Sequence, residues 1–166
     1  MAKRAGPEVT LMSNTYTVER SRHIAASVQA VRERIVDLHR WETWSPWEGL
    51  DPDMRRAYGG AASGVGSWYE GEGNRKAGKG RMEIIGADDL FVRLDLQFLK
   101  PFKSHSNTTF AFRPDGDGTQ VTWAMVGPQS AITKVMGLFT SMDEMIGPDF
   151  EKGLEQLKIE AEAAGG

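Results

Sequence analysis

The chain has 166 residues, of which 40% are hydrophobic and 26% charged, an ordinary composition for a globular protein with one substantial core. Its net charge of −3 gives no overall attraction to nucleic acid, and residues 143–162 carry seven acidic against two basic side chains. The absence of cysteine excludes disulfides and thiolate chemistry. No apolar run approaches the ~20 residues that span a bilayer, so we expect no stable membrane insertion.

Residues 1–13 predict a loose tail, and residues 14–163 predict a single domain. The tail has no apolar segment of the kind found in signal peptides, so we expect a cytoplasmic protein. Residues 15–25 alternate loosely between apolar and polar and predict a first strand. Ser27 is a suitable helix N-cap, and a short helix is predicted to follow it up to residue 38.

Strand patterns dominate the middle of the chain. Residues 90–98 alternate with period two, which predicts a sheet with one dry face. Residues 104–113 and 119–126 predict two further strands, joined by a turn at Pro114-Asp115-Gly116-Asp117-Gly118. The glycines around 74–80 predict another hairpin. On the three strand segments the residues expected on one face are Leu90, Val92, Leu94, Leu96, Phe98, Ser104, Ser106, Thr108, Phe110, Phe112, Val121, Trp123 and Met125.

Helical periodicity returns only at the end of the chain. A single helix from 130 to 162 would be about 50 Å long, and Gly147-Pro148 predicts a break. We therefore expect one helical piece near 131–145 and a kinked or restarted helix at 148–162. Their apolar stripe comprises Ile132, Val135, Phe139, Met142, Ile146, Phe150, Leu154 and Leu157.

This order of elements predicts an α+β fold. A long helix that follows a run of antiparallel strands buries its apolar face across the sheet. A curved sheet closed by one helix encloses space, which indicates a pocket for a ligand. A core filled by its own side chains is the alternative.

Five segments together resemble the START-related polyketide cyclase/dehydrase and lipid-transport superfamily, across about residues 16–162. The resemblance implies a helix-grip fold, a curved antiparallel sheet wrapped around a long C-terminal helix with a cavity between them. The chain departs from the pattern at Gly71, where relatives carry a tryptophan, so either the cavity is larger there or Trp68 fills the room. The segments are WETWSPW (41–47), GVGSWYEGEGNRKAGKGRMEI (64–84), FLKPFKSHSNTTFAF (98–112), GTQVTWAMVG (118–127) and MDEMIGPDFEKGLEQLK (142–158).

The leading hypothesis is binding or transport of a small hydrophobic molecule in the cavity between the sheet and the C-terminal helix. A mostly apolar lining with a few polar groups is typical of small-molecule sites. The expected ligand-binding residues are Tyr69, Met82, Ile84, Leu94, Leu96, Phe98, Ser106, Thr108, Phe110, Trp123, Met125, Met142, Ile146 and Phe150.

Two other functions stay open: an enzyme of the polyketide cyclase/dehydratase type, and an interaction module for a protein partner. The enzyme would draw its proton-transfer groups from Tyr69, His105 and Asp143. No catalytic set, cofactor or metal site is predicted, because the three histidines are scattered and none pairs with a ligand at metal-binding spacing. The tryptophans at 41, 44 and 47 either anchor a loop on the core or cap a cavity mouth. A homodimer also stays open.

Overall fold

The computed structural model describes residues 15–75, 78–100, 103–128 and 141–165. The predicted N-terminal tail lies outside these residues, as do Ile132, Val135 and Phe139 of the predicted C-terminal stripe. Within the described ranges the chain forms a seven-stranded sheet, two α-helices and a short 3-10 helix.

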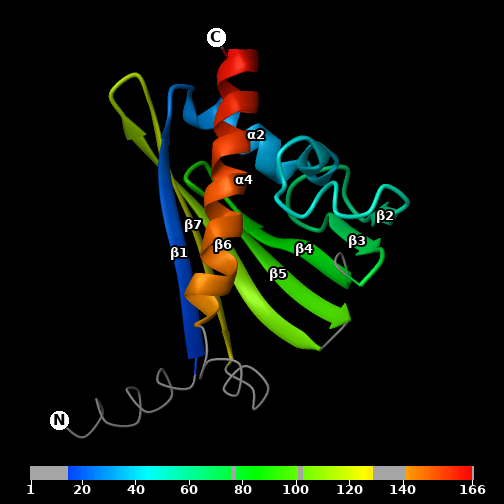
Figure 1. Ribbon diagram of the computed structural model, residues 1–166. Coiled ribbons are helices and arrows are strands. Elements are labelled where there is room, and N and C mark those ends of the chain that lie inside the picture. The colour runs from blue at the N-terminus through cyan, green and yellow to red at the C-terminus, as the bar shows by residue number, and fades with distance from the viewer. Residues whose placement is uncertain (1–14, 76–77, 101–102, 129–140, 166) are drawn as a thin grey trace, which may run out of the picture.

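The seven strands form one curved antiparallel sheet (Figure 1), which confirms the predicted α+β helix-grip architecture. Their order is β1-β7-β6-β5-β4-β3-β2, so β1 returns to pair with the last strand while each later strand pairs with the next along the chain. Gly116 has a φ of +61° in the predicted turn between β6 and β7, a conformation that favours glycine. The strands are β1 (Thr15–Ile24), β2 (Arg55–Gly59), β3 (Trp68–Glu72), β4 (Lys79–Ala87), β5 (Phe91–Lys100), β6 (Ser104–Asp115) and β7 (Gly118–Pro128).

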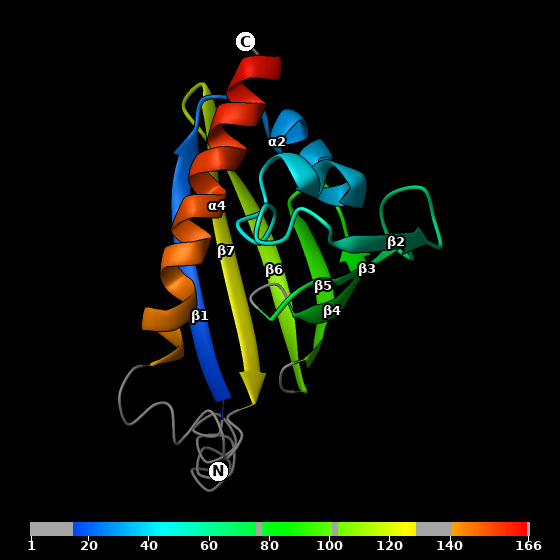
Figure 2. The same cartoon turned by 45° about the vertical axis from the view of Figure 1, so that its right-hand side comes forward.

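Helices cover one face of the sheet. Helix α2 (Val28–Val36) begins at the predicted cap, where the Ser27 hydroxyl accepts from the Ala30 N–H, and leads into the 3-10 helix η2 (Leu38–Thr43). Helix α4 (Met142–Gly165) lies lengthwise against the sheet beside β1, with α2 next to its C-terminal half (Figure 2). The buried stripe of α4 consists of Phe150, Leu154, Leu157 and Ala161.

The inner face of the sheet is built from rows of directly paired residues. Val18, Met125, Thr108, Leu94 and Ile84 form one such row, which runs from β1 to β4. All five are buried, and Thr108 is the polar member of an otherwise apolar row. Because paired residues share a face in an antiparallel sheet, this register confirms the predicted inward direction of β5, β6 and β7.

Two residues predicted on the inner face are exposed. Leu90 is 52% exposed, because β5 begins only at Phe91. The Asp88 carboxylate accepts from the backbone N–H groups of Leu90 and Phe91, at 2.7 and 3.0 Å, and holds Leu90 in the preceding turn. Ser104 is exposed at the first position of β6.

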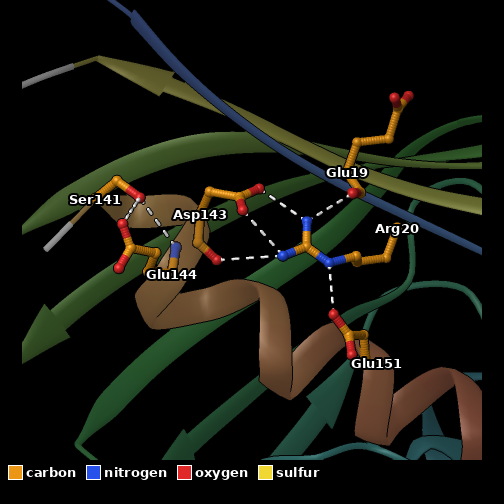
Figure 3. A network of polar contacts seen from close by, with 6 residues as sticks. All are labelled: Glu19, Arg20, Ser141, Asp143, Glu144 and Glu151. Atoms are coloured by element: carbon orange, nitrogen blue, oxygen red, sulfur yellow. Dashed lines mark hydrogen bonds and ion pairs between the residues drawn. The ribbon is translucent and has the colours of Figure 1, made fainter.

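Of the two alternatives expected at Pro148, the restarted helix is wrong, since α4 runs without interruption from Met142 through the proline, while the kink stays a prediction. Ser141 caps its first turn by accepting from the Glu144 N–H. Arg20 on β1 binds Asp143 and Glu151 on the two sides of Pro148, each at 2.8 Å (Figure 3). These bonds bridge the turn in which proline removes a backbone donor. Gly147 is needed beneath them, because a Cβ there would overlap the guanidinium of Arg20.

Candidate functional site

The sheet, the segment that contains Trp41 and Trp47, and helix α4 together line a small inner cavity. Its volume is about 20 Å³, which is room for about one water molecule. No charged side chain of the described residues lines it. The lining residues are Trp41, Trp47, Met82, Leu94, Leu96, Thr108, Trp123, Met125 and Phe150.

The cavity is small because aromatic rings fill most of the space between the sheet and α4. Trp123 stacks against Phe150 of α4, with ring centroids 4.0 Å apart, and against Phe110 of β6 at 4.8 Å. Trp44 meets the edge of this stack, 5.7 Å from Trp123. In this conformation the interior therefore resembles a packed core more than the wide cavity expected from the sequence.

A second, outer cavity lies beside the first and is more open to solvent. Its volume is about 90 Å³. Trp47, Met82 and Leu96 line both cavities and so form the wall between them. The lining of the outer cavity comprises Ser45, Trp47, Glu48, Met54, Tyr69, Gly71, Gly80, Arg81, Met82, Leu96 and Phe98.

The three clustered tryptophans have different roles. The Trp41 indole donates to the Ile35 carbonyl at 2.8 Å, and the Trp44 indole donates to the Arg34 carbonyl at 2.9 Å. Both are buried and fasten the loop to α2, as the packing interpretation predicts. Trp47 contacts Trp123 and Phe150 edge-on, but no hydrogen bond within the described residues holds its indole. Trp47 is therefore the least constrained part of the wall between the cavities.

Strand β3 turns Tyr69 and Gly71 towards the outer cavity. Tyr69 pairs with Met82 and Gly71 pairs with Gly80, so two glycines face each other across the strands at this cavity. A Cβ at Gly71 would lie 2.6 Å from the Tyr69 hydroxyl oxygen, so the Tyr69 ring occupies the room above the glycine. The idea that Trp68 fills this room is wrong. Trp68 lies on the opposite face of the sheet. The guanidinium carbon of Arg81 lies over its ring, 4.6 Å from the ring centroid.

The outer cavity also holds polar groups. Arg56 of β2 forms an ion pair with Glu48, whose side chain is only 15% exposed. Tyr69 donates a long hydrogen bond of 3.6 Å to the Met54 sulfur. Burial raises the pKa of the Tyr69 phenol, and the charge of Glu48 adds to the shift, so the hydroxyl is protonated at neutral pH.

The expected ligand-binding residues separate into four groups. Met82, Leu94, Leu96, Thr108, Trp123, Met125 and Phe150 line the inner cavity, and Tyr69 and Phe98 line the outer one. Ile84, Ser106 and Phe110 are buried in the core but line neither of the two cavities, and Met142 and Ile146 pack, partly buried, against the core. Sequence reasoning missed Met54, Glu48 and the wall position of Trp47, because all three lie in an irregular loop without periodicity.

The three candidate catalytic side chains lie on different elements and do not converge. His105 is 60% exposed on β6 and pairs with Asp95 of β5, on the face away from α4. Asp143 lies at the start of α4, where the Arg20 guanidinium lowers the pKa of its carboxyl (Figure 3). Tyr69 alone lines a cavity. Asp143 therefore has a structural role through its ion pair with Arg20. Neither His105 nor Asp143 lies with Tyr69 at the outer cavity.

Two searches of the described residues bear on metals and membranes. In residues 15–75, 78–100, 103–128 and 141–165, no three or more His, Cys, Asp or Glu side chains form a group that could hold a metal ion. In the same part of the chain, no helix combines the length and the apolar composition required to cross a membrane. The expectation of a metal-free protein stays a prediction.

Solved structures share this architecture. StfQ, a di-domain ARO/CYC from the steffimycin biosynthetic pathway, matches with a TM-score of 0.72 and 12% identity, over 97% of this chain and 55% of StfQ. Protein CV1439 from Chromobacterium violaceum has a TM-score of 0.61 and 16% identity, over 86% of this chain and 95% of its own. Mll3558 from Rhizobium loti has a TM-score of 0.61 and 20% identity, over 88% and 96%. At these identities the likeness shows the fold alone.

Sequence comparison gives the family. No curated protein matches the chain. A family model described as polyketide cyclase / dehydrase and lipid transport matches residues 15–162, which extends from the first residue of β1 almost to the end of α4. The match spans the sheet, both cavities and the helix that closes them. The chain therefore belongs to the polyketide cyclase/dehydrase and lipid-transport family.

Proposed function

We propose that this protein binds a small, neutral hydrophobic molecule between the sheet and α4, within a single domain of residues 14–163. The observation that carries the proposal is the pair of adjoining cavities, one apolar, the other more open to solvent and partly polar. Ligand sites are typically apolar pockets with a few placed polar groups. The ligand would occupy the outer cavity first, between Tyr69, Phe98 and Leu96, and then extend inward.

Entry requires a movement, since the two volumes of about 20 and 90 Å³ are well below the ~300 Å³ of an ordinary ligand pocket. Trp47 is the side chain best suited to move. Its two aromatic contacts are edge-on, its indole lacks a hydrogen bond within the described residues, and it lies in a loop. Displacement of this indole would join the two cavities. We therefore propose Trp47 as the gate to the inner space.

Thermal stability in the presence of neutral apolar molecules tests the proposal. A single-site ligand at 100 times its dissociation constant stabilises a protein by about 2.7 kcal/mol, which corresponds to a rise in melting temperature of several degrees at this size. The expected result is a saturable shift with a stoichiometry of one. If no member of a broad hydrophobic panel shifts the melting temperature, the proposal fails.

Two matched truncations test the gate. Trp47→Ala should speed ligand association, because it removes the wall between the cavities. Trp44→Ala removes the same side chain from a buried, hydrogen-bonded site that lines neither cavity, and should instead destabilise the fold by about 3–5 kcal/mol without faster association. Equal association rates for wild type and Trp47→Ala would remove Trp47 from the proposal.

The enzyme alternative has one observation in its favour. Tyr69 presents a protonated hydroxyl in the outer cavity, near the Arg56–Glu48 ion pair, and a positioned phenol can act as a general acid. The structural likeness to an ARO/CYC protein makes a poly-β-keto compound the substrate class to try. Turnover that Tyr69→Phe abolishes would favour the enzyme, whereas binding without turnover would favour the carrier.

A further inference from the structure

We infer that a group of basic side chains at one end of the sheet, the basic rim, binds the surface of an anionic lipid bilayer and brings the outer cavity beside it. The inference rests on the proposed function and names the partner from which the protein would take its hydrophobic ligand. All members of the rim are exposed except one, which is partly buried. They are Arg55, Arg75, Lys100 and Lys103, with Lys79 as the partly buried member.

Strand pairing places the rim at a single end of the sheet. One row of directly paired residues crosses four strands there, where β2 and β4 begin and β3 and β5 end. Arg75 lies in the connection from β3 to β4, and Lys103 directly precedes β6. Cations from four parts of the chain therefore come together. The row consists of Arg55, Glu72, Lys79 and Lys100.

The rim keeps a positive charge after its ion pairs are counted, although the whole chain carries −3. Glu72 forms ion pairs with Arg55 at 3.2 Å and with Lys100 at 3.4 Å. In the adjoining loop, the Asp51 carboxylate accepts from the Asn74 N–H at 2.8 Å. Within the described residues, the rim members that form no ion pair are Arg75, Lys79 and Lys103.

Helix α4 has the opposite charge and lies at the other edge of the sheet. It carries seven acidic and two basic side chains. It packs beside β1, whereas β2 and β3 form the opposite edge (Figure 1). An anionic surface therefore attracts the rim and repels α4, and this asymmetry orients the approach of the protein.

The outer cavity reaches almost to the rim. Gly71, Gly80 and Phe98 line this cavity, and each lies one or two residues from the charged row, about 3–7 Å along a strand.

The chemistry of the ligand selects the anionic partner. A neutral hydrophobic molecule of the kind proposed for the cavity partitions into lipid bilayers. An anionic bilayer supplies both the charge that the rim attracts and the ligand that the cavity accepts, whereas nucleic acid supplies the charge alone. Binding would be to the surface, as no helix of the described residues is suited to cross a membrane.

Co-sedimentation with lipid vesicles tests the inference. Wild type should bind vesicles of phosphatidylcholine mixed with phosphatidylglycerol and should not bind vesicles of phosphatidylcholine alone. High salt should weaken the binding, because it screens the charges. The double variant Arg75→Gln/Lys103→Gln removes two exposed cations and should bind the anionic vesicles about 30-fold more weakly.

The double variant Arg113→Gln/Lys152→Gln is the matched control. It removes one arginine and one lysine, both exposed, and so gives the same net charge. Arg113 lies near the other end of β6 from Lys103, and Lys152 lies on α4. This variant should bind within about three-fold of wild type, since charges more than ~8 Å from the membrane are largely screened.

Amide hydrogen exchange supplies a second measurement on the unmutated protein. Anionic vesicles should slow exchange in the peptides that contain Arg75 and Lys103, and leave exchange in α4 unchanged. Slower exchange in α4, with none at the rim, would overturn the proposed orientation.

The outcomes separate membrane docking from the proposed function. Equal binding of wild type to neutral and anionic vesicles, or equal losses in the two double variants, would overturn the rim as the docking surface. Binding of a DNA duplex as tightly as anionic vesicles would overturn the lipid bilayer as its partner. If wild type binds no vesicles while neutral hydrophobic molecules still raise its melting temperature, docking fails and the proposed function stands. If vesicles bind and no hydrophobic molecule raises the melting temperature, the proposed function fails, and the inference fails with it.

Discussion

Gly71 and Tyr69 provide a sharp test of how the outer cavity is built. A Cβ at Gly71 would lie 2.6 Å from the Tyr69 hydroxyl oxygen, and 3.1 Å from the ring carbon that carries it. The backbone of Gly71 does not have a positive φ, so an alanine there would be strained only by the tyrosine. A left-handed backbone conformation therefore does not explain the glycine at this position.

The expected change in the free energy of unfolding on Gly71→Ala follows from two opposing effects. Gly→Ala at an unstrained position stabilises by about 0.4–1 kcal/mol through the unfolded chain, whereas overpacking costs about 1–3 kcal/mol. Gly71→Ala should therefore lower the free energy of unfolding by about 1 kcal/mol. In a Tyr69→Phe background the oxygen at 2.6 Å is absent, so the same substitution should be close to neutral.

Urea unfolding of wild type, Gly71→Ala, Tyr69→Phe and the double variant measures the coupling between the two sites. We expect a coupling free energy of about 1 kcal/mol between the two sites. An equal loss of stability in both backgrounds would refute the reasoning, as it would mean that the Tyr69 hydroxyl does not occupy the room above Gly71. The same measurement bears on the ligand, because a tryptophan at residue 71 could fit only by displacing Tyr69 from the outer cavity.

Three further predictions concern α4 and metals. Leu154→Ala should lower the free energy of unfolding by about 2–5 kcal/mol, while Gln156→Ala, exposed two positions on, should change it by less than about 0.5 kcal/mol; equal losses in urea unfolding would contradict the assigned buried face. Arg20 lowers the pKa of Asp143, so the contribution of this carboxylate to stability is complete above its unfolded-state pKa of about 3.9 and is lost as the pH falls through the lower folded-state value. Wild type should therefore be more stable than Asp143→Asn at neutral pH and lose that advantage progressively as the pH falls below about 3.9, and a difference in stability between the two proteins that does not change with pH would exclude the pairing. Chelator treatment should leave the melting temperature unchanged, and stoichiometric zinc or iron in untagged protein would overturn this.

The sequence by itself determined the fold to a large extent. Alternation along β5, β6 and β7 predicted which residues face inward, because a strand with one dry face places every second side chain in the core. The cap at Ser27 and the Asp-Gly turn near residue 116 are local, and each follows from a few neighbouring residues. The apolar stripe of α4 was likewise readable from its spacing.

Only the tertiary structure decided how much space remains inside. The stack of Trp123 on Phe110 and Phe150 joins β6, β7 and α4, and no local pattern encodes how completely three rings fill a cavity. The ion pairs that bridge α4 across Pro148 come from Arg20, a residue more than a hundred positions away. Periodicity reports which face a residue occupies, whereas the volume of a cavity arises from contacts among elements distant in the chain.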